Sequence, residues 1–138
     1  IGANIFLGVG AYLAGYVSNR RTDVMIRNAS SAVTNGNLLL IFPEGTRTTQ
    51  QPVNTIKPGA ALISKRSEAA LQTIIIVTNS AYLSKGWPIF RPPIFPLIYR
   101  AKLGDKFLYS GSNVQTTNQL QAYFENSITS SIDPKIKI

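Results

Sequence analysis

The densest run of apolar positions in the chain is the sequence Leu-Leu-Leu-Ile-Phe at residues 38–42, which lies between Gly36-Asn37 and Pro43. Five large apolar residues in a row are too few for an independent helix and are typical of a strand that is buried on both faces. Pro43 has no N–H with which to continue a strand ladder, so the chain must turn there. Gly45 tolerates the positive φ that a tight turn demands. We therefore predict a central strand of an α/β sheet that ends in a turn.

Helical periodicity is found on both sides of this strand. From Thr22 or Asp23 as N-cap, apolar residues recur at helical spacing as far as Val33, and Gly36 is placed to end the helix. A second helix is predicted over residues 60–71. Both helices are expected to pack on the sheet.

The pattern predicts two further strands and a last helix. Residues 73–77 form a short apolar run rich in β-branched residues, and residues 97–103 alternate roughly between apolar and polar. The order strand, helix, strand indicates a right-handed βαβ unit with parallel strands. An amphipathic helix with Thr117 or Asn118 as its cap extends to about Ile128. The expected fold class is α/β, with a mixed, largely parallel sheet flanked by helices.

Two segments have compositions that are found near membranes. Residues 1–19 carry no charge, and since a spanning helix needs about 20 predominantly apolar residues, a spanning helix, a membrane-facing helix and an ordinary core helix all stay open. Residues 85–96 contain four prolines and cannot be helical. They combine aromatic rings with Lys85 and Arg91, as do loops that meet lipid headgroups. We hypothesise that this loop touches the bilayer or an acyl chain, and the alternative is a cover over the sheet edge.

The net charge of the chain indicates what kind of partner it binds. Fourteen Lys and Arg residues against six acidic residues give a formal charge of +8, which favours a polyanion such as nucleic acid or an anionic membrane. The basic residues are spread along the chain and form no arginine-rich run or base-stacking motif. A membrane partner is therefore preferred, and a nucleic-acid-binding module is kept as the weakest alternative. The absence of Cys excludes a disulfide framework and a thiolate metal site.

The turn after the first predicted strand carries the candidate chemistry. Arg47 offers a planar fork of donors for a phosphate or carboxylate, Thr46 adds a hydroxyl, and Glu44 can orient the guanidinium or accept a hydrogen bond from a substrate. The carboxyl end of such a strand is where open α/β sheets bind ligands. The simpler alternative is a polar turn whose Glu and Arg form a surface ion pair.

The block Phe42-Pro43-Glu44-Gly45-Thr46-Arg47 resembles the signature of the glycerolipid acyltransferases, the family that includes 1-acylglycerol-3-phosphate acyltransferase. The resemblance continues after a polar loop with Lys57-Pro58-Gly59-Ala60 at a helix start, and it covers roughly residues 1–106. It implies a glycerol-3-phosphate acyltransferase-like fold. We interpret the 138 residues as a single partial acyltransferase domain that is truncated at its N-terminus, with residues 107–138 as a C-terminal helix and tail.

The resemblance also implies which residues bind the acceptor. In the family, the signature Arg and a second Arg after an apolar block hold the acceptor's phosphate, which here points to Arg47 with Arg20 or Arg21. Asn19 takes the polar role in a similar bacterial branch. Lys57 would add a further cation, and Glu44, Gly45 and Thr46 would shape the turn and contact the glycerol hydroxyls.

The reaction implied by the resemblance belongs to phospholipid biosynthesis. A fatty acyl group moves from a thioester, on coenzyme A or acyl carrier protein, to the hydroxyl of a lysophospholipid-type acceptor at the cytoplasmic face of a membrane, without a further cofactor or metal. The resemblance implies that the general base is the His of a His-x4-Asp block upstream of this region, and the chain itself contains no His. No catalytic residue is therefore assigned in this chain. A non-catalytic, lipid-binding member of the same fold is the main alternative.

Overall fold

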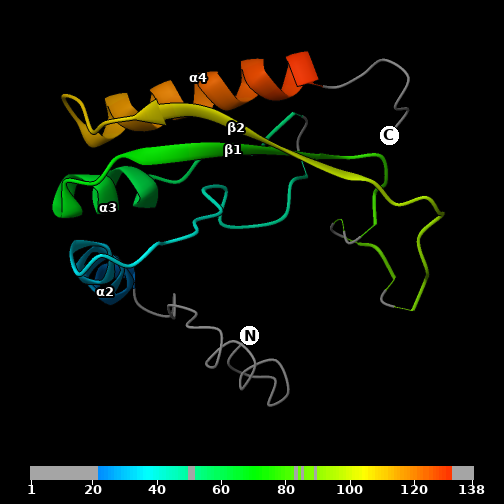
Figure 1. Ribbon diagram of the computed structural model, residues 1–138, viewed down its shortest axis with the longest axis horizontal. Coiled ribbons are helices and arrows are strands. Elements are labelled where there is room, and N and C mark those ends of the chain that lie inside the picture. Colours follow the sequence, from blue (N-terminus) through cyan, green and yellow to red (C-terminus); the bar gives the residue numbers. More distant parts are fainter. Residues whose placement is uncertain (1–21, 50–51, 83, 85, 89, 132–138) are drawn as a thin grey trace.

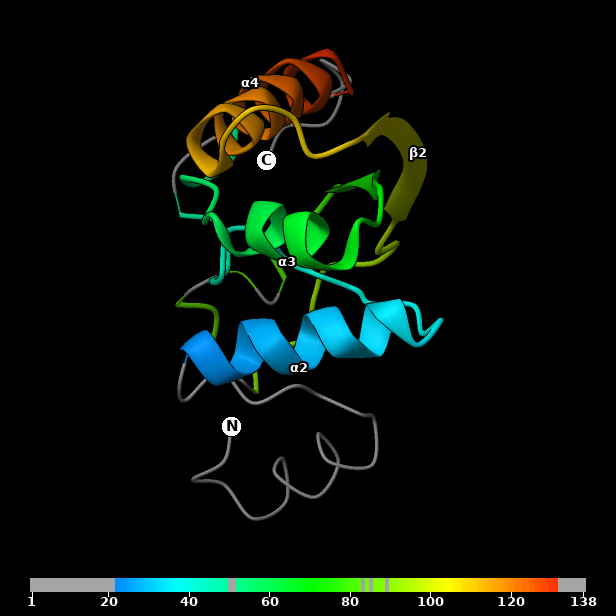
Figure 2. The same cartoon turned by 90° about the vertical axis from the view of Figure 1, so that its left-hand side faces the viewer.

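The computed structural model describes residues 22–49, 52–82, 84, 86–88 and 90–131. Its elements are α2 (Thr22–Thr34), α3 (Gly59–Ser67), β1 (Leu71–Thr78), β2 (Tyr99–Phe107) and α4 (Asn113–Ser131) (Figure 1). Figure 2 shows α2, α3 and α4 stacked one above another, with β2 along one side of the stack. The described part of the chain is therefore mixed α/β, as predicted.

The sheet of the described residues consists of two antiparallel strands. The register pairs Leu71 of β1 with Phe107 of β2 at one end and Thr78 with Tyr99 at the other. The predicted largely parallel sheet is thus not what these residues form. The sequence pattern located β1 and β2 but not their pairing, because pairing depends on contacts between residues that are distant along the chain.

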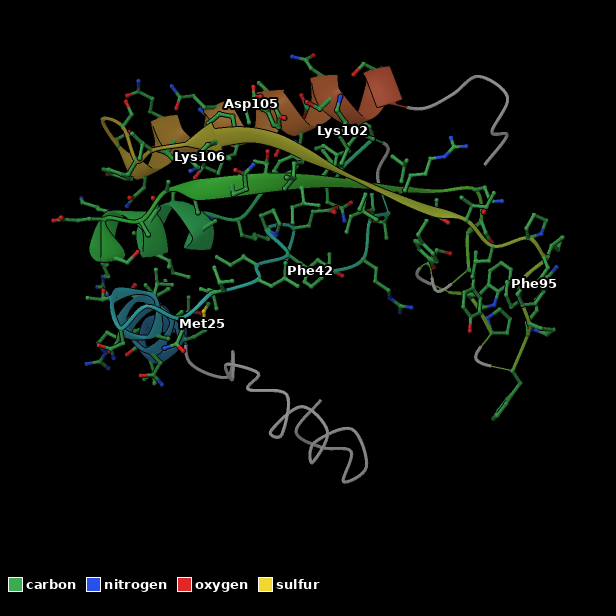
Figure 3. The ribbon with its side chains drawn as sticks, in the orientation of Figure 1. Met25, Phe42, Phe95, Lys102, Asp105 and Lys106 are labelled. Carbon is green, nitrogen blue, oxygen red and sulfur yellow. The ribbon has the colours of Figure 1, made fainter. Side chains whose placement is uncertain are left out.

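The prediction of a strand over residues 38–42 is wrong. These residues belong to no strand or helix. Leu39 and Ile41 pack against the core, whereas Leu38, Leu40 and Phe42 are 103%, 72% and 65% exposed. The segment is covered on one side only, because the two described strands pair with each other and leave it outside the sheet. Figure 3 shows Phe42 on the same side of the sheet as α2.

The core lies between α2 and α3. Ile26 and Ala29 of α2 meet Ile63 of α3, and partly buried apolar residues surround them. The face that α2 turns to the core contains Ile26, Ala29 and Ser30, at helical spacing of three and four residues. Since the extended segment 38–42 packs on this same cluster, the core fixes where the following turn is placed.

The predicted C-terminal end is correct for α2 and wrong for α3, and the two residues predicted as the cap of α2, Thr22 and Asp23, lie in its first turn. Gly36 takes φ +85° just after α2, as expected of a residue that ends a helix. Helix α3 ends at Ser67, four residues earlier than predicted, because Glu68 takes the left-handed conformation at φ 55°. The hydroxyl of Ser64 donates to the carbonyl of Ala69 at 2.6 Å, which stabilises this early exit toward β1.

Helix α4 begins four residues before the predicted cap. Ser112 is its cap, since the N–H of Gln115 donates to Oγ of Ser112 at 3.1 Å and the N–H of Thr116 donates to the Ser112 carbonyl at 3.0 Å. Thr116 is fully buried, and its hydroxyl donates to the carbonyl of Ser110. The sequence pattern missed this start because the first turn of α4 is mostly polar, and its apolar residue, Val114, is exposed.

Replacing Ser112 with alanine is expected to lower the free energy of unfolding by about 1 kcal/mol, because an N–H at the start of α4 loses its acceptor. Urea denaturation followed by circular dichroism measures the change. Ser130→Ala, at the exposed opposite end of α4, is the matched control and should change stability by less than about 0.5 kcal/mol. Equal stabilities of the two variants would contradict the capping assignment.

Among the residues that the structure describes, no helix is both long and apolar enough to cross a membrane. Residues 1–19, for which three interpretations were left open, lie outside this part of the chain.

Candidate functional site

The signature block forms a tight turn beside the start of α3. The N–H of Gly45 donates to the carbonyl of Phe42 at 3.0 Å, and Gly45 takes φ +69°, so the predicted need for glycine is confirmed. The N–H of Lys57 donates to the carbonyl of Pro43 at 2.8 Å. A Cβ on Gly45 would lie 3.7 Å from Cγ of Lys57. The fold therefore brings Lys57 next to the signature turn, as expected.

Glu44 uses both of its carboxylate oxygens inside the loop. The hydroxyl of Thr48 donates to Oε1 and the N–H of Asn54 donates to Oε2, each at 2.8 Å. Hydrogen bonds to a charged acceptor are roughly twice as strong as neutral ones. Glu44 thus ties the two ends of the loop together, and this geometry fits a residue that shapes the turn.

Asn54 is the central residue of the loop, and the sequence analysis did not single it out. Its side chain is buried, and Oδ1 accepts hydrogen bonds from the N–H of Thr49 at 3.0 Å and from the Thr49 hydroxyl at 3.1 Å. Its amide Nδ2 donates to the carbonyl of Arg47 at 3.1 Å. The available signal was weak: an Asn, which often bonds to nearby backbone groups, between the apolar residues Val53 and Ile56.

Thr46 and Arg47 lie on the surface of the loop that Glu44 and Asn54 stabilise, and both are exposed. Nη1 of Arg47 donates to the carbonyl of Ser84 at 3.0 Å. The guanidinium therefore lies between the signature turn and the segment that leads from β1 toward β2. A guanidinium presents five N–H donors in a planar fork, a geometry that suits a phosphate or carboxylate.

The start of α3 adds to the positive character of the site. Pro58 precedes α3 with φ −71°, and no side chain caps this end of the helix. Backbone N–H groups at a helix start, together with the helix dipole, favour anions. Lys57 is exposed directly before this start. Arg47, Lys57 and the N-terminus of α3 thus border one turn of the chain.

Helix α4 contacts the segment just before Lys57. The N–H of Ile56 donates to Oε1 of Gln121 at 2.7 Å, and Nε2 of Gln121 donates to Oε1 of Glu125 at 2.7 Å. Ile56 is itself buried. The position of Lys57 is therefore fixed on one side by the signature turn and on the other by α4.

The other predicted site residues, Asn19, Arg20 and Arg21, lie outside the described residues. A hollow of about 300 Å³ lies elsewhere, between the end of α3 and the segment after β2, and is lined by Ser64, Lys65, Glu68, Ala69, Leu108 and Tyr109. None of its lining residues belongs to the signature turn.

Comparison with known proteins gives one result. Residues 3–99 match the family model described as Acyltransferase. No curated protein and no solved structure matches the chain. The match contains α2, the signature turn, α3 and β1, and it ends where β2 begins. Because it covers more than half of the 138 residues, the chain belongs to the acyltransferase family.

Proposed function

We propose that this chain binds the anionic acceptor of an acyltransferase that moves a fatty acyl group from acyl-coenzyme A or acyl carrier protein to a lysophospholipid-type acceptor. 1-Acylglycerol-3-phosphate is the acceptor that best fits the resemblance of the signature block. The site residues in this proposal are Arg47 and Lys57 for the phosphate, with Glu44, Gly45 and Thr46 forming the turn. Arg20 or Arg21, with Asn19, would complete the acceptor site.

One observation carries the proposal: the signature turn holds Arg47 outward while Lys57 is fixed at the same turn. The carboxylate of Glu44 accepts bonds from Thr48 and Asn54. The carbonyl of Arg47 accepts a hydrogen bond from Asn54, and the exposed guanidinium of Arg47 donates to the carbonyl of Ser84. A planar guanidinium suits bidentate binding of a phosphate.

Acceptor binding is expected to require the phosphate and Arg47. Isothermal titration with a 1-acylglycerol-3-phosphate, below its micelle-forming concentration, should show tighter binding than titration with the matching monoacylglycerol. Arg47→Ala should weaken binding of the phosphate-bearing lipid by about 10- to 100-fold, since bonds between charged groups contribute about 1.5–3 kcal/mol. The affinity of Arg47→Lys should lie between those of the unchanged chain and Arg47→Ala, because an ammonium keeps the charge but lacks the planar fork of donors.

The matched control is Arg27→Ala. Arg27 is exposed on α2, where it pairs with Asp23 at 3.7 Å, so its removal takes away one positive charge far along the chain from the turn. This control should bind the acceptor as the unchanged chain does. Equal affinity of Arg47→Ala and the unchanged chain would overturn the assignment of the phosphate site.

Binding is a better readout than turnover for this chain. A positioned general base typically contributes 10² to 10⁴ in rate, and the sequence contains no His. Phosphate-dependent binding in a complete protein that lacks transfer from any acyl thioester would favour the alternative, a lipid-binding member of the family without catalysis.

A further inference from the structure

We propose that the loop formed by residues 87–88 and 90–98 is a docking surface for an anionic lipid bilayer. The loop extends beyond the ends of β1 and β2, away from the three helices (Figure 1), and Figure 3 shows Phe95 at this far end. Phe90, Ile94 and Phe95 are 96%, 83% and 76% exposed. Large apolar side chains grouped at one projecting place on a molecule are typical of an interaction site.

The loop is held in shape by hydrogen bonds within it and with Asn79, the residue after β1. The indole N–H of Trp87 donates to the carbonyl of Arg91 at 2.8 Å, and the Arg91 guanidinium lies 5.1 Å from the centre of the Trp87 ring. At the other end, Nδ2 of Asn79 donates to the carbonyl of Pro96 at 2.8 Å, and the N–H of Ile98 donates to Oδ1 of Asn79 at 2.9 Å. The exposed rings therefore face solvent in a braced loop, and docking would require little ordering of the backbone.

The charge around the loop identifies the partner as anionic lipid. Residues 69–104 contain no Asp or Glu. Arg91 lies within the loop, and Arg100 follows it at the start of β2, both exposed. Exposed rings flanked by cations, without acidic residues, suit a surface with apolar depth and negative headgroups, where each basic residue contributes about 1 kcal/mol. An acidic protein partner would satisfy the charges but would provide less depth for three large apolar side chains.

The docking surface is continuous with the candidate acceptor site. Ser84, whose carbonyl accepts the hydrogen bond from Arg47, precedes Trp87 by three residues, and the N–H of Trp87 donates to this same carbonyl at 3.1 Å. Arg47 and Trp87 therefore share one acceptor atom. Docking of the loop would place the guanidinium of Arg47 near the headgroups. The inference itself does not depend on the proposed acyl transfer and is tested without it.

Sedimentation with vesicles tests the proposal directly. The chain should bind phosphatidylcholine vesicles that contain phosphatidylglycerol, and binding should weaken as salt is added. Phe90→Ser/Phe95→Ser should lower the partition coefficient by about tenfold or more, since each ring loses apolar burial. Arg91→Gln/Arg100→Gln should lower binding by about tenfold on phosphatidylglycerol vesicles only.

Matched controls remove equal numbers of apolar or basic residues elsewhere. Leu108→Ser/Val114→Ser removes two side chains that are each 69% exposed near the start of α4, and Arg27→Gln/Arg66→Gln removes two exposed charges from α2 and α3. Both controls should bind vesicles as the unchanged chain does. Circular dichroism confirms that each variant is folded. Unchanged binding by Phe90→Ser/Phe95→Ser would overturn the proposal.

Trp87 supplies a second readout because it is the one Trp in the sequence. Its fluorescence should be quenched by phosphatidylcholine that is brominated on its acyl chains, in vesicles that also contain phosphatidylglycerol. Vesicle binding without quenching would mean that another face of the molecule meets the bilayer, and would also overturn the proposal. The loop variants should still bind monomeric 1-acylglycerol-3-phosphate, which separates docking from acceptor binding.

Discussion

Replacing Asn54 with alanine is expected to lower the free energy of unfolding by about 2–3 kcal/mol and to weaken acceptor binding. The side chain of Asn54 makes three hydrogen bonds, two with Thr49 and one with the carbonyl of Arg47. Each contributes about 1 kcal/mol, and buried groups that lose their partners cost more. Since the backbone of Arg47 would lose its anchor, the guanidinium would no longer be held toward an anion. Urea denaturation and calorimetric titration measure the two effects.

Two further variants make this test specific. Asn118→Ala, at an exposed position of α4, should leave both stability and acceptor binding unchanged. Asn54→Asp keeps an acceptor for Thr49 but replaces the donor to Arg47 with an oxygen, and it adds a negative charge beside Glu44. It should therefore retain part of the stability and bind an anionic acceptor as weakly as Asn54→Ala. An Asn54→Ala variant as stable and as tight-binding as Asn118→Ala would show that the loop is organised by other contacts.

Gly104→Ala should lower the free energy of unfolding by about 1–3 kcal/mol, the usual cost of extra volume in a filled space. A Cβ at Gly104 would overlap the hydroxyl of Tyr123 and would lie 2.5 Å from Oγ1 of Thr73. Both hydroxyls are held in place, because the N–H of Asp105 donates to Tyr123 and the Thr73 hydroxyl donates to the carbonyl of Asp105, each at 2.7 Å. The added methyl group must displace these bonds, which join β2 to β1 and α4.

A matched control and a second substitution test this explanation. Gly59 has no atom within 4 Å of the position of an added Cβ and begins α3, so Gly59→Ala should not destabilise the fold. In Gly104→Ala/Tyr123→Phe the loss should be smaller than the sum of the single losses, because the overlapping hydroxyl is gone. Additive losses would contradict the overlap as the cause.

The pKa of Tyr123 gives an independent readout of the same contacts. Its hydrogen bond with the hydroxyl of Thr73, and next its bond with the N–H of Asp105, lower the pKa of Tyr123 from its ordinary value of 10.0. In Gly104→Ala these bonds are displaced, so the pKa should rise back toward that value. The difference in phenolate absorbance on titration between each protein and its Tyr123→Phe counterpart isolates this group from the other five tyrosines.

The sequence predicted elements well where local signals decide them. Asp23 in the first turn and Gly36 after the last one located α2. Where the outcome depends on distant residues, prediction failed. The apolar run at residues 38–42 could not reveal that the described strands pair without it, and the antiparallel pairing of β1 with β2 has the same long-range origin. The early end of α3 has a local cause, the left-handed Glu68 and the hydrogen bond from Ser64 to Ala69, but a Glu gives no sequence signal for such an end.

The candidate site was predicted in part. The turn at Gly45 and the approach of Lys57 are as expected, and the bonds of Glu44 fit its expected role in shaping the turn. Asn54 was missed because one Asn in a polar loop carries no periodic signal. Its burial depends on contacts with Thr49 and Arg47 that only the folded loop provides. The roles of Arg47 and Lys57 toward an acceptor remain predictions for the binding experiments.

The extended segment at residues 38–42 has a practical consequence for handling the protein. Leu38, Leu40 and Phe42 form an exposed apolar face of this extended segment. Within the described structure, no strand pairs with the backbone of the segment. An extended, apolar segment with an unpaired backbone can pair with the same segment of another molecule. The purified chain should therefore aggregate as its concentration rises. A charged residue in place of Leu38, whose side chain is wholly exposed, is the simplest way to keep the chain monodisperse without disturbing Leu39 and Ile41.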